Sequence, residues 1–483
     1  MNSMEFKRVF FCLFLAFVFI SLFSSSTSWM YDNVEYLDSD VFSVVGKYWA
    51  QGYLPYIDLW DQKGPIIHFV NAIGYTIANV RIGVFGVQVV CLAVTFYFTV
   101  KLLQEEFGIK ASLLLTVIAA LGLLNDYGVA GNNVEEYLLP LLTMTFYYMY
   151  KWAHEPQKIA GSHSPYFAAV YGIAFGISIY TRMTNAVGLC GGVLIIALFM
   201  FHQRQWGNLF RNAIAFLIGT LIVLLPFIIY FYYHNGLYEL WYGTISYNVE
   251  YAQNAPQLDP FSLNQTLYLY KSALNGLLLL IVSLYLLCFV KERKVGLLWL
   301  SVSLFSLLWL MTGNGFHHYF IITYPYFCIC INELYALNRK HKMKRSVSFR
   351  SICAISLVLF LASTYEMYGA YRKLTSNNDN LSFYDEVKSD IPTQDFNSFV
   401  AYNVSPYIYL YLDVKPCCRF FAYQDPQISF GHTLKEKVMR EFEQKKAKWI
   451  LMANDSKNLA NLLKQEYKLE KCYENGMKLY RHR

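Results

Sequence analysis

Acidic and basic side chains gather in one stretch near the start of the chain, between Asp38 and Pro65. The stretch reads DSDVFSVVGKYWAQGYLPYIDLWDQKGP and follows a first apolar run, in a chain of 483 residues of which only 15% are charged. Its charged side chains are Asp38, Asp40, Lys47, Asp58, Asp61 and Lys63. A carboxylate can take a proton from a hydroxyl group, and a lysine can hold a phosphate. This stretch therefore indicates polar chemistry at a membrane surface.

Asp38 and Asp40 lie two positions apart, so on a helix they point to different faces. We expect that they do not share one site and that one of them caps the helix that follows. The alternative is that both are caps or solvated loop carboxylates. Lys63 stands in QKGP at the entry to the next apolar segment. It is a candidate to hold a lipid phosphate, or else an interfacial lysine whose ammonium group extends toward water.

Two adjacent glutamates, Glu135 and Glu136, stand at the start of an apolar segment in AGNNVEEYLLP. Carboxylates at the beginning of a helix interact favourably with its dipole, which gives a purely structural interpretation. The alternative is that one of the two organises an acceptor molecule or a divalent cation beside Asp38. The sequence thus names both as metal-ligand candidates, although it requires neither a metal nor another cofactor, and no spacing resembles a zinc site.

Arg182 and Asn185 lie between two apolar segments in YTRMTNA, and His318 and Tyr319 open another in HHYFIITYP. Charged residues among membrane segments are costly to bury and are functional candidates by default. The arginine is a candidate to hold a phosphate, and His318 or Tyr319 is a candidate to contact a phosphate or a substrate hydroxyl. Alternatively, the arginine extends toward water and the aromatic side chains anchor their segment at the membrane surface.

The composition places the chain among multi-pass membrane proteins. Hydrophobic residues make up 56% and aromatic residues 18% of the chain, and repeated apolar runs are long enough to cross a bilayer. The net charge of +7 comes from loops between these runs and not from one basic face, which argues against a nucleic-acid partner. Among ten cysteines, Cys472 could pair with Cys417 or Cys418 if their polar segment faces an oxidising compartment.

Apolar runs predict about eleven membrane-spanning helices. They lie near residues 9–23, 83–103, 111–128, 137–152, 165–181, 186–202, 212–232, 270–290, 295–312, 317–336 and 350–368. Residues 66–80 are amphipathic and poor for spanning, so we expect a helix on the membrane surface there. With this assignment the basic loops KERK and NRKHKMKR fall inside, as the positive-inside rule requires, and the polar motifs fall outside.

The last part of the chain, residues 370–483, is polar. The strand-like segments SFVAYNV and KWILMAND alternate with the helix-like segments LKEKVMREFEQKK and SKNLANLLKQEY, which predicts a small α/β domain. We therefore expect a mainly α-helical membrane domain at residues 1–369, with an outer first loop at 29–82, and an extracytoplasmic α/β domain at 370–483.

Taken in order, DSDVFSVVGKYWAQGYLPYIDLWDQKGP, GNNVEEYLLP, YTRMTNA and HHYFIITYP resemble the motifs of bacterial membrane glycosyltransferases of the C-type fold. These are relatives of the protein O-mannosyltransferases, glycosyltransferase family 39, and of the aminoarabinose transferase that modifies lipid A. The resemblance covers roughly residues 8–370. It implies transfer of a hexosyl or pentosyl group from a polyprenyl-phosphate sugar to a lipid, glycan or protein acceptor. It also implies an active site on the extracytoplasmic side of the inner (plasma) membrane.

The resemblance implies a role for several residues. Asp38 matches the catalytic base that follows the first span, and Lys63 matches the lysine that binds the donor phosphate. Aminoarabinose transferases carry an acidic metal-site residue before that lysine, whereas this chain has Gln62, so the resemblance does not imply a metal. The candidates for binding substrate or phosphate are Lys63, Arg182, His318, Tyr319, Glu135, Glu136 and Asp40.

A mechanism follows from the leaving group. A polyprenyl phosphate departs as a stabilised anion, so no general acid is needed, in contrast to the two carboxylates of glycosidases. One base must deprotonate the acceptor hydroxyl, and cations must hold the departing phosphate. Attack opposite the phosphate predicts inversion at the sugar carbon.

Two other functions use the same lipid-linked sugars and stand as alternatives. A transporter or flippase would place charges within its spans, whereas the charges here cluster at the predicted outer ends. A polymerase or ligase of surface polysaccharide would use basic and histidine residues in a large outer loop, and the loop at residues 234–270 is poor in basic residues.

Overall fold

The computed structural model of the chain describes residues 3–31, 35–78, 81–127, 130–154, 161–254, 273–290, 293–312, 317–340, 367–369, 371–372, 380–453 and 455–483. The chain divides into two compact units, each made of three segments. Unit 1 comprises Met1–Ser24, Gln88–Phe227 and Gln257–Lys373, and unit 2 comprises Ser25–Val87, Ile228–Pro256 and Leu374–Arg483. The C-terminal domain therefore shares a unit with the first loop. The predicted domain boundary between residues 369 and 370 stays a prediction.

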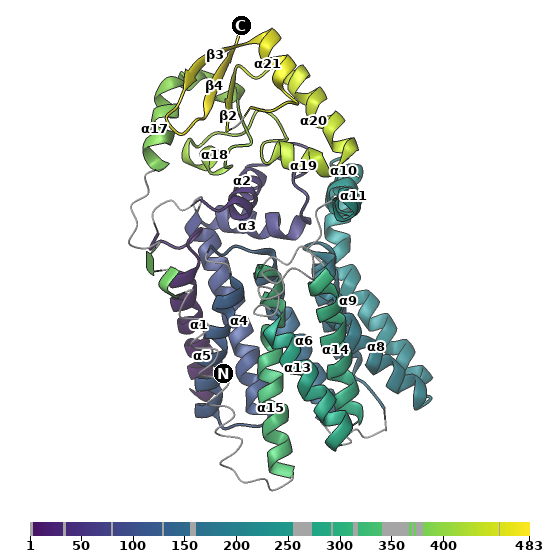
Figure 1. Ribbon diagram of the computed structural model, residues 1–483. Helices are drawn as coiled ribbons and strands as arrows, with labels where there is room; N and C mark the ends of the chain where they lie inside the picture. The colour runs from purple at the N-terminus through teal and green to yellow at the C-terminus, as the bar shows by residue number, and fades with distance from the viewer. Residues whose placement is uncertain are drawn as a thin grey trace. The chain divides into compact units, whose positions relative to one another are not determined.

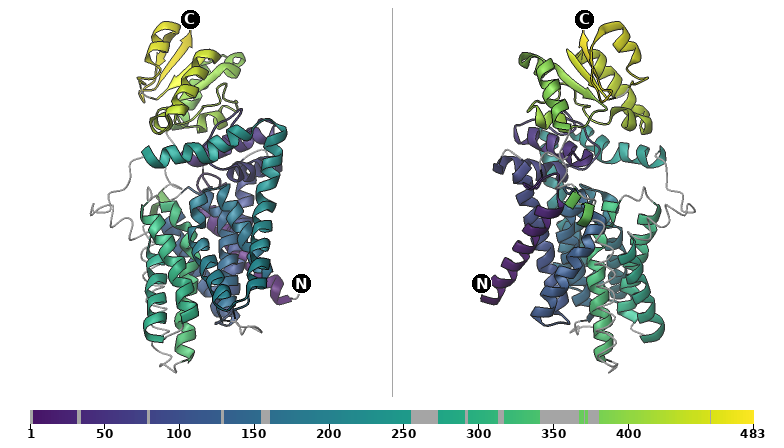
Figure 2. Two further views of the ribbon diagram at one scale, coloured as in Figure 1. Left: turned by 90° about the vertical axis from the view of Figure 1, so that its right-hand side faces the viewer. Right: turned by 60° about the vertical axis from the view of Figure 1, so that its left-hand side comes forward.

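Unit 1 is a bundle of long helices that run side by side in Figures 1 and 2. They are α1 (Ser3–Phe23), α4 (Arg81–Gln104), α5 (Ile109–Tyr127), α6 (Val134–His154), α7 (Pro165–Ile179), α8 (Val187–His202), α9 (Trp206–Tyr233), α13 (Leu274–Tyr285), α14 (Arg293–Thr312) and α15 (Tyr324–Lys340). Helix α4 begins, and α9 ends, within unit 2. Short turns of helix precede α8 and α15: η1 (Met183–Ala186) and η4 (His317–Thr323).

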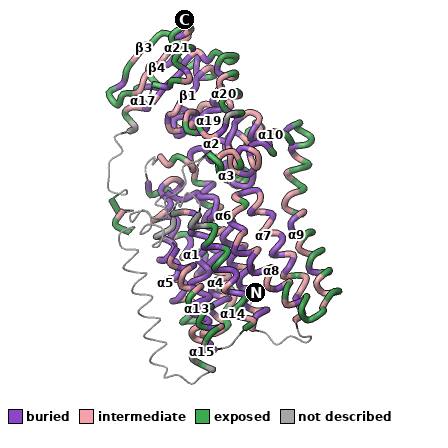
Figure 3. Tube along the Cα trace, turned by 45° about the vertical axis from the view of Figure 1, so that its right-hand side comes forward, coloured by how far each residue is buried: buried purple, intermediate pink, exposed green. Residues whose placement is uncertain are grey.

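Helices of spanning length confirm a multi-pass membrane protein. Among the described residues, five helical segments are long and apolar enough to cross a bilayer: Ser3–Phe23, Arg81–Gln104, Met183–His202, Trp206–Tyr233 and His318–Leu337. Shorter apolar helices coincide with the spans predicted at 111–128, 165–181 and 270–290, and the spans predicted at 137–152 and 295–312 lie on α6 and α14. The span predicted at 350–368 lies almost wholly outside the described residues. Figure 3 shows that most of α9 is exposed or half-buried. Its exposed side chains are largely apolar, which suits contact with lipid.

Unit 2 begins with two packed helices, α2 (Leu37–Ala50) and α3 (Pro65–Ala78). The polar residues His68 and Asn71 of α3 are fully buried, whereas Phe69, Ile73 and Ile77 are exposed on the same helix. Residues four apart share a face, so α3 presents an apolar stripe outward and its polar residues to the protein. This pattern is the one expected of a helix that lies on a membrane surface.

Three short helical segments continue from the end of α9: α10 (Leu237–Trp241), the π-helical turn η2 (Tyr242–Ser246) and α11 (Tyr247–Asn254). They hold the first loop and the C-terminal domain together. Trp60 of the first loop packs edge-on against Tyr247, and the hydroxyl of Tyr247 donates a hydrogen bond to the carbonyl of Gln427 at 2.9 Å.

The C-terminal domain is a four-stranded sheet with the order β1-β2-β4-β3. Strands β1 (Phe399–Tyr402) and β2 (Trp449–Met452) are parallel, and β4 (Lys478–His482) pairs antiparallel with both β2 and β3 (Tyr467–Cys472). The helices are α17 (Asn380–Asp390), η5 (Thr393–Ser398), α18 (Tyr407–Tyr411), α19 (Gln424–Phe430), α20 (His432–Lys445) and α21 (Ala460–Glu466). The small α/β domain predicted for this part of the chain is confirmed (Figure 1).

One face of this sheet forms the core of the domain. Side chains that alternate along β1 and β2, such as Val400 and Ile450, pack with Leu434, Val438 and Phe442 of α20. The cysteines of the domain are free thiols. The Sγ atoms of Cys417 and Cys418 lie 3.9 Å apart, and Cys472 is exposed, so the disulfide that the sequence left open is not formed.

Candidate functional site

Asp38 and Asp40, in the first turn of α2, have different environments. Asp38 is half-buried and makes no hydrogen bond or ion pair with any described residue. Asp40 is 4% exposed, and its carboxylate accepts hydrogen bonds from the backbone N–H of Tyr36 at 3.0 Å and from the hydroxyl of Ser405 at 3.3 Å. Asp40 therefore ties the start of α2 and the C-terminal domain together, while the carboxylate of Asp38 is available for chemistry.

The burial of Asp40 predicts a pH dependence of stability. Burial raises the pKa of Asp40, and the charge of Glu35 adds to this, while the hydrogen bonds from Tyr36 and Ser405 oppose it. The folded protein then binds this proton more tightly than the unfolded chain does. Stability therefore falls as the pH rises above about 3.9, the ordinary pKa of an aspartate, toward the raised value.

We expect Asp40→Asn to remove this loss of folding stability at higher pH, because asparagine cannot ionise and its carbonyl can still accept both hydrogen bonds. The thermal midpoint of the purified protein in detergent should rise by roughly 2–4 °C at neutral pH and be unchanged near pH 4. Asp455→Asn, at an exposed aspartate, serves as the control. An equal shift in both variants, or a lower midpoint for Asp40→Asn at neutral pH, would contradict the expectation.

Lys63 lies at the end of a turn whose backbone is held from two sides. The backbone of Tyr56 is left-handed, with φ 67°, and its hydroxyl donates a hydrogen bond to the carbonyl of Lys63 at 2.6 Å. The side-chain amide of Asn248, on α11, donates to the carbonyl of Gln62 at 2.8 Å. A half-buried lysine on a fixed backbone loses less entropy when it binds an anion.

A buried acid and a buried histidine lie beside this turn. The Oδ2 atom of Asp61 and the Nε2 atom of His68 are 3.2 Å apart, at an ion-pair distance but without hydrogen-bond geometry. Burial raises the pKa of Asp61, but His68 and the charge of Lys63 outweigh it, so the pKa lies below its usual range. Asp61 is therefore an ionised carboxylate that interacts electrostatically with the side chain of Lys63.

In unit 1, three separate parts of the chain bring five predicted polar residues together. The Oε1 atom of Glu135, at the start of α6, accepts a hydrogen bond from the amide of Asn185 at 3.2 Å and lies 3.7 Å from Nη1 of Arg182. The guanidinium of Arg182 lies over the ring of Tyr319, 3.0 Å from its centroid, and His318 packs edge-on against that ring. A planar cation fixed between a carboxylate and an aromatic face is suited to hold a phosphate.

Glu136 has other partners than Glu135. Its Oε1 atom accepts hydrogen bonds from the backbone and side-chain N–H groups of Asn133 at 2.7 and 3.0 Å, and its Oε2 atom accepts one from Gln88 at 2.8 Å. The preceding Gly131 is left-handed, with φ 74°, and a Cβ there would collide with Ser24. Glu136 therefore connects its loop to α4, and Glu135 is the member of the pair that faces the guanidinium of Arg182.

The two glutamates do not form a metal site by themselves. Their carboxylates are directed at different partners, and the described residues contain no group of three His, Cys, Asp or Glu side chains that could hold a metal ion.

Some contacts of these groups were missed by sequence reasoning. Gln88 and Ser24 lie within apolar segments and carry no motif, although a glutamine on a spanning helix is a signal of a buried polar partner. His68 was interpreted only as a polar residue of a surface helix, and its contact with Asp61 depends on the turn between α2 and α3. The predicted grouping of Asp38 with Glu135 and Glu136 stays a prediction, because Asp38 belongs to unit 2 and both glutamates to unit 1.

Residues 62–233 match the family model of dolichyl-phosphate-mannose-protein mannosyltransferases. The matched segment contains Lys63, Glu135 and Arg182, whereas Asp38 precedes it. Among curated proteins, no sequence match to the chain is found.

Solved structures agree with this match in fold. The structures of ArnT from Cupriavidus metallidurans, bound to undecaprenyl phosphate and in the apo state, match with TM-scores of 0.62 and 0.61 at 11% and 12% identity. Each match covers 99% of this chain and 98% of the other. The chain has the fold of the C-type glycosyltransferases. The Archaeoglobus fulgidus oligosaccharyltransferase tethered with an acceptor peptide containing the NVT sequon matches at a TM-score of 0.47 and 12% identity, covering 99% of this chain and 74% of the other.

The described residues include the groups that a glycosyltransferase reaction needs, namely carboxylates and cations. The family match and the fold together confirm the prediction of a membrane glycosyltransferase. The roles of individual residues stay predictions. The environments of Asp38 and Asp40, and of Glu135 and Glu136, now separate a candidate for chemistry from a structural partner in each pair.

Proposed function

We propose that this membrane glycosyltransferase transfers a sugar from a polyprenyl-phosphate donor to an acceptor hydroxyl on the extracytoplasmic side of the inner membrane. The family model matched by residues 62–233 is named for a lipid-phosphate sugar donor, and one matching C-type structure holds undecaprenyl phosphate. The observation that carries the proposal is the half-buried carboxylate of Asp38, which makes no hydrogen bond or ion pair with a described residue in a unit that also contains Lys63.

The reaction needs one base and several cations. The carboxylate of Asp38 takes the proton of the acceptor hydroxyl as the oxygen attacks the first carbon of the sugar. The bond from that carbon to the phosphate oxygen breaks, and polyprenyl phosphate leaves with the electron pair. Lys63, in the same unit as Asp38, stabilises the charge that develops on the phosphate, and Arg182 is the second candidate cation for this role. Attack opposite the leaving group inverts the configuration of the sugar carbon.

The activity can be tested in membrane vesicles from cells that produce the full chain, which also contain the natural acceptor. The donors are tritium-labelled undecaprenyl-phosphate mannose, glucose and aminoarabinose, each supplied separately. We expect one of them to transfer its label to a membrane component with release of undecaprenyl phosphate. Vesicles with the wild-type protein that transfer no more label than vesicles without it, from any donor, would refute the proposed function.

The extracytoplasmic position proposed for the first loop is inferred from the charges of the other loops. It predicts a labelling pattern. Gln51, after α2, and Gln203, after α8, are both exposed and are expected on opposite sides. In intact cells, an impermeant thiol reagent should modify Gln51→Cys and leave Gln203→Cys unmodified until the membrane is opened. The variants would be made in a chain whose exposed Cys288 and Cys472 are replaced by serine. The reverse labelling pattern would place Asp38 on the cytoplasmic side.

A further inference from the structure

Tyr423 of the C-terminal domain has an unusual backbone conformation. It precedes α19 with φ 52° and ψ 36°, in the left-handed region that bulky side chains rarely adopt. The next residue, Gln424, fixes this conformation, because its side-chain amide donates to the carbonyls of Ala401 and Phe420 at 3.0 and 2.9 Å. Its side-chain oxygen accepts from the backbone N–H of Asn403 at 2.8 Å. This network holds the backbone of Tyr423 in its strained conformation and thereby fixes the direction of its side chain.

The hydroxyl of Tyr423 is buried without a hydrogen-bond partner among the described residues. Most buried tyrosine hydroxyls find a partner, because an unsatisfied polar group in the interior is destabilising. Other tyrosines of the same domain follow this rule: Tyr402 donates to Asp425, and Tyr467 donates to the carbonyl of Ala447. A strained backbone and an unsatisfied hydroxyl in the same residue indicate a side chain that binds a ligand.

Carboxylates of the first loop act on this hydroxyl through their charges. Burial, and then the charges of Asp38, Asp40 and Asp61, raise the pKa of Tyr423 above its usual range, so the phenol is neutral and can donate as well as accept. The contact between the two segments is direct. The backbone N–H of Trp60 donates to the carbonyl of Arg419 at 2.9 Å, and the ring of Trp60 packs on Phe420.

We propose that Tyr423 binds the acceptor molecule and positions its hydroxyl group for deprotonation by Asp38, so that the C-terminal domain supplies part of the active site. This inference rests on the proposed function. The acceptor fits this position better than the donor phosphate, because three carboxylates repel an anion, whereas a neutral hydroxyl can donate to a carboxylate and accept from the phenol. Tyr423 is thus a positioning residue, and Asp38 remains the base.

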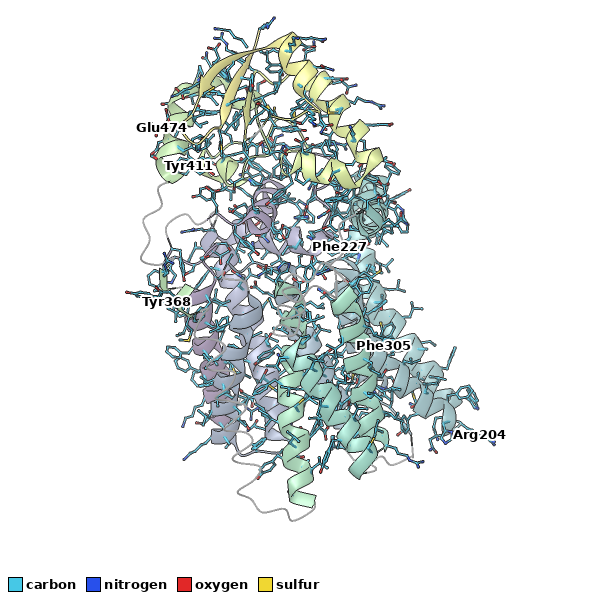
Figure 4. The ribbon with its side chains drawn as sticks, in the orientation of Figure 1. Arg204, Phe227, Phe305, Tyr368, Tyr411 and Glu474 are labelled. Carbon is cyan, nitrogen blue, oxygen red and sulfur yellow. The ribbon has the colours of Figure 1, made fainter. Side chains whose placement is uncertain are left out.

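The test compares Tyr423→Phe with Tyr411→Phe in the vesicle assay described above, and measures both transfer to the membrane acceptor and release of free sugar to water. Tyr411 lies on α18 of the same domain, is labelled in Figure 4, and donates its hydroxyl to Asp385 at the surface. We expect Tyr423→Phe to lower transfer about tenfold, the value of one lost hydrogen bond to a substrate. Hydrolysis by water, which needs no positioning, should persist with an unchanged KM for the donor.

A measurement of thermal unfolding separates this role from a structural one. Because no described residue bonds to the Tyr423 hydroxyl, Tyr423→Phe should unfold at the wild-type temperature. Equal transfer by both variants would overturn the inference, as would a raised KM for the donor or a lower unfolding temperature that accounts for the lost transfer. A wild-type protein that transfers no label from any donor refutes the proposed function itself, and the inference fails with it.

Discussion

Replacement of Asp38 by asparagine is expected to abolish sugar transfer and to leave donor binding intact. The carboxylate makes no hydrogen bond or ion pair with a described residue, so its loss removes a proton acceptor without breaking a structural contact. General-base catalysis contributes about a hundred- to ten-thousand-fold to a rate, and asparagine of nearly equal size cannot take the proton. Initial rates of label transfer in vesicles and the affinity for undecaprenyl phosphate, measured in parallel, separate the two effects.

Asp40→Asn is the matched control for this prediction. Both substitutions replace a carboxyl group in the first turn of α2 by an amide, but the carboxyl group of Asp40 is occupied by Tyr36 and Ser405. We expect Asp40→Asn to retain most of the wild-type rate. Equal rates for Asp38→Asn and the wild-type protein would remove Asp38 from the mechanism. Equally severe losses in both variants would indicate that the charge of the turn matters and not the base.

The helices of the bundle were predictable because their signal is local. An apolar run of spanning length needs no knowledge of its neighbours, and each run predicted between residues 83 and 336 lies on a helix. The surface position of residues 66–80 stays a prediction. The amphipathic pattern behind it was visible for the same reason, since His68 and Asn71 interrupt an apolar pattern at helical spacing. Their burial could not be predicted, because it depends on α2, which approaches so closely that a Cβ at Gly46 would collide with Asn71.

Contacts between distant segments account for what the sequence did not reveal. The last two strands, β3 and β4, lie in a polar segment that carries no strong alternation, and they are defined by their pairing with β2. Similarly, nothing near Lys47 in the sequence indicates that its ammonium group pairs with Asp413 at 2.5 Å. The contact of Trp60 with Arg419, which joins the first loop to the segment before Tyr423, also arises only when the C-terminal domain folds onto the first loop.

In the candidate site, too, individual residues could be predicted from the sequence, whereas most of their contacts could not. Arg182, Asn185, His318 and Tyr319 were chosen as polar residues in apolar surroundings, and the structure places them around Glu135. The choice between Glu135 and Glu136 could not be made from sequence, because adjacent residues at a helix start have the same local environment. In the structure the two glutamates differ in their partners: Gln88 donates to Glu136 and Asn185 donates to Glu135 from different helical segments.

Arg182 gives the second large expected effect. Its guanidinium is held between the ring of Tyr319 and the carboxylate of Glu135, with 23% of the side chain exposed. A charge-assisted hydrogen bond to a phosphate contributes about 1.5–3 kcal/mol, so Arg182→Ala should weaken binding of undecaprenyl phosphate about ten- to hundredfold. Arg182→Lys should recover only part of this affinity, because an ammonium keeps the charge but not the planar pair of donors.

Arg204→Ala is the control for a general loss of positive charge. Arg204 lies in the turn after α8, is exposed, and is labelled in Figure 4. Binding of undecaprenyl phosphate to this variant should equal that of the wild-type protein. If Arg182→Ala also binds undecaprenyl phosphate with wild-type affinity, Arg182 does not contact the phosphate. Its ion pair with Glu135 then only stabilises the start of α6. If Arg182→Lys binds as tightly as the wild-type protein, charge alone suffices, and the planar arrangement over Tyr319 has no part in recognition.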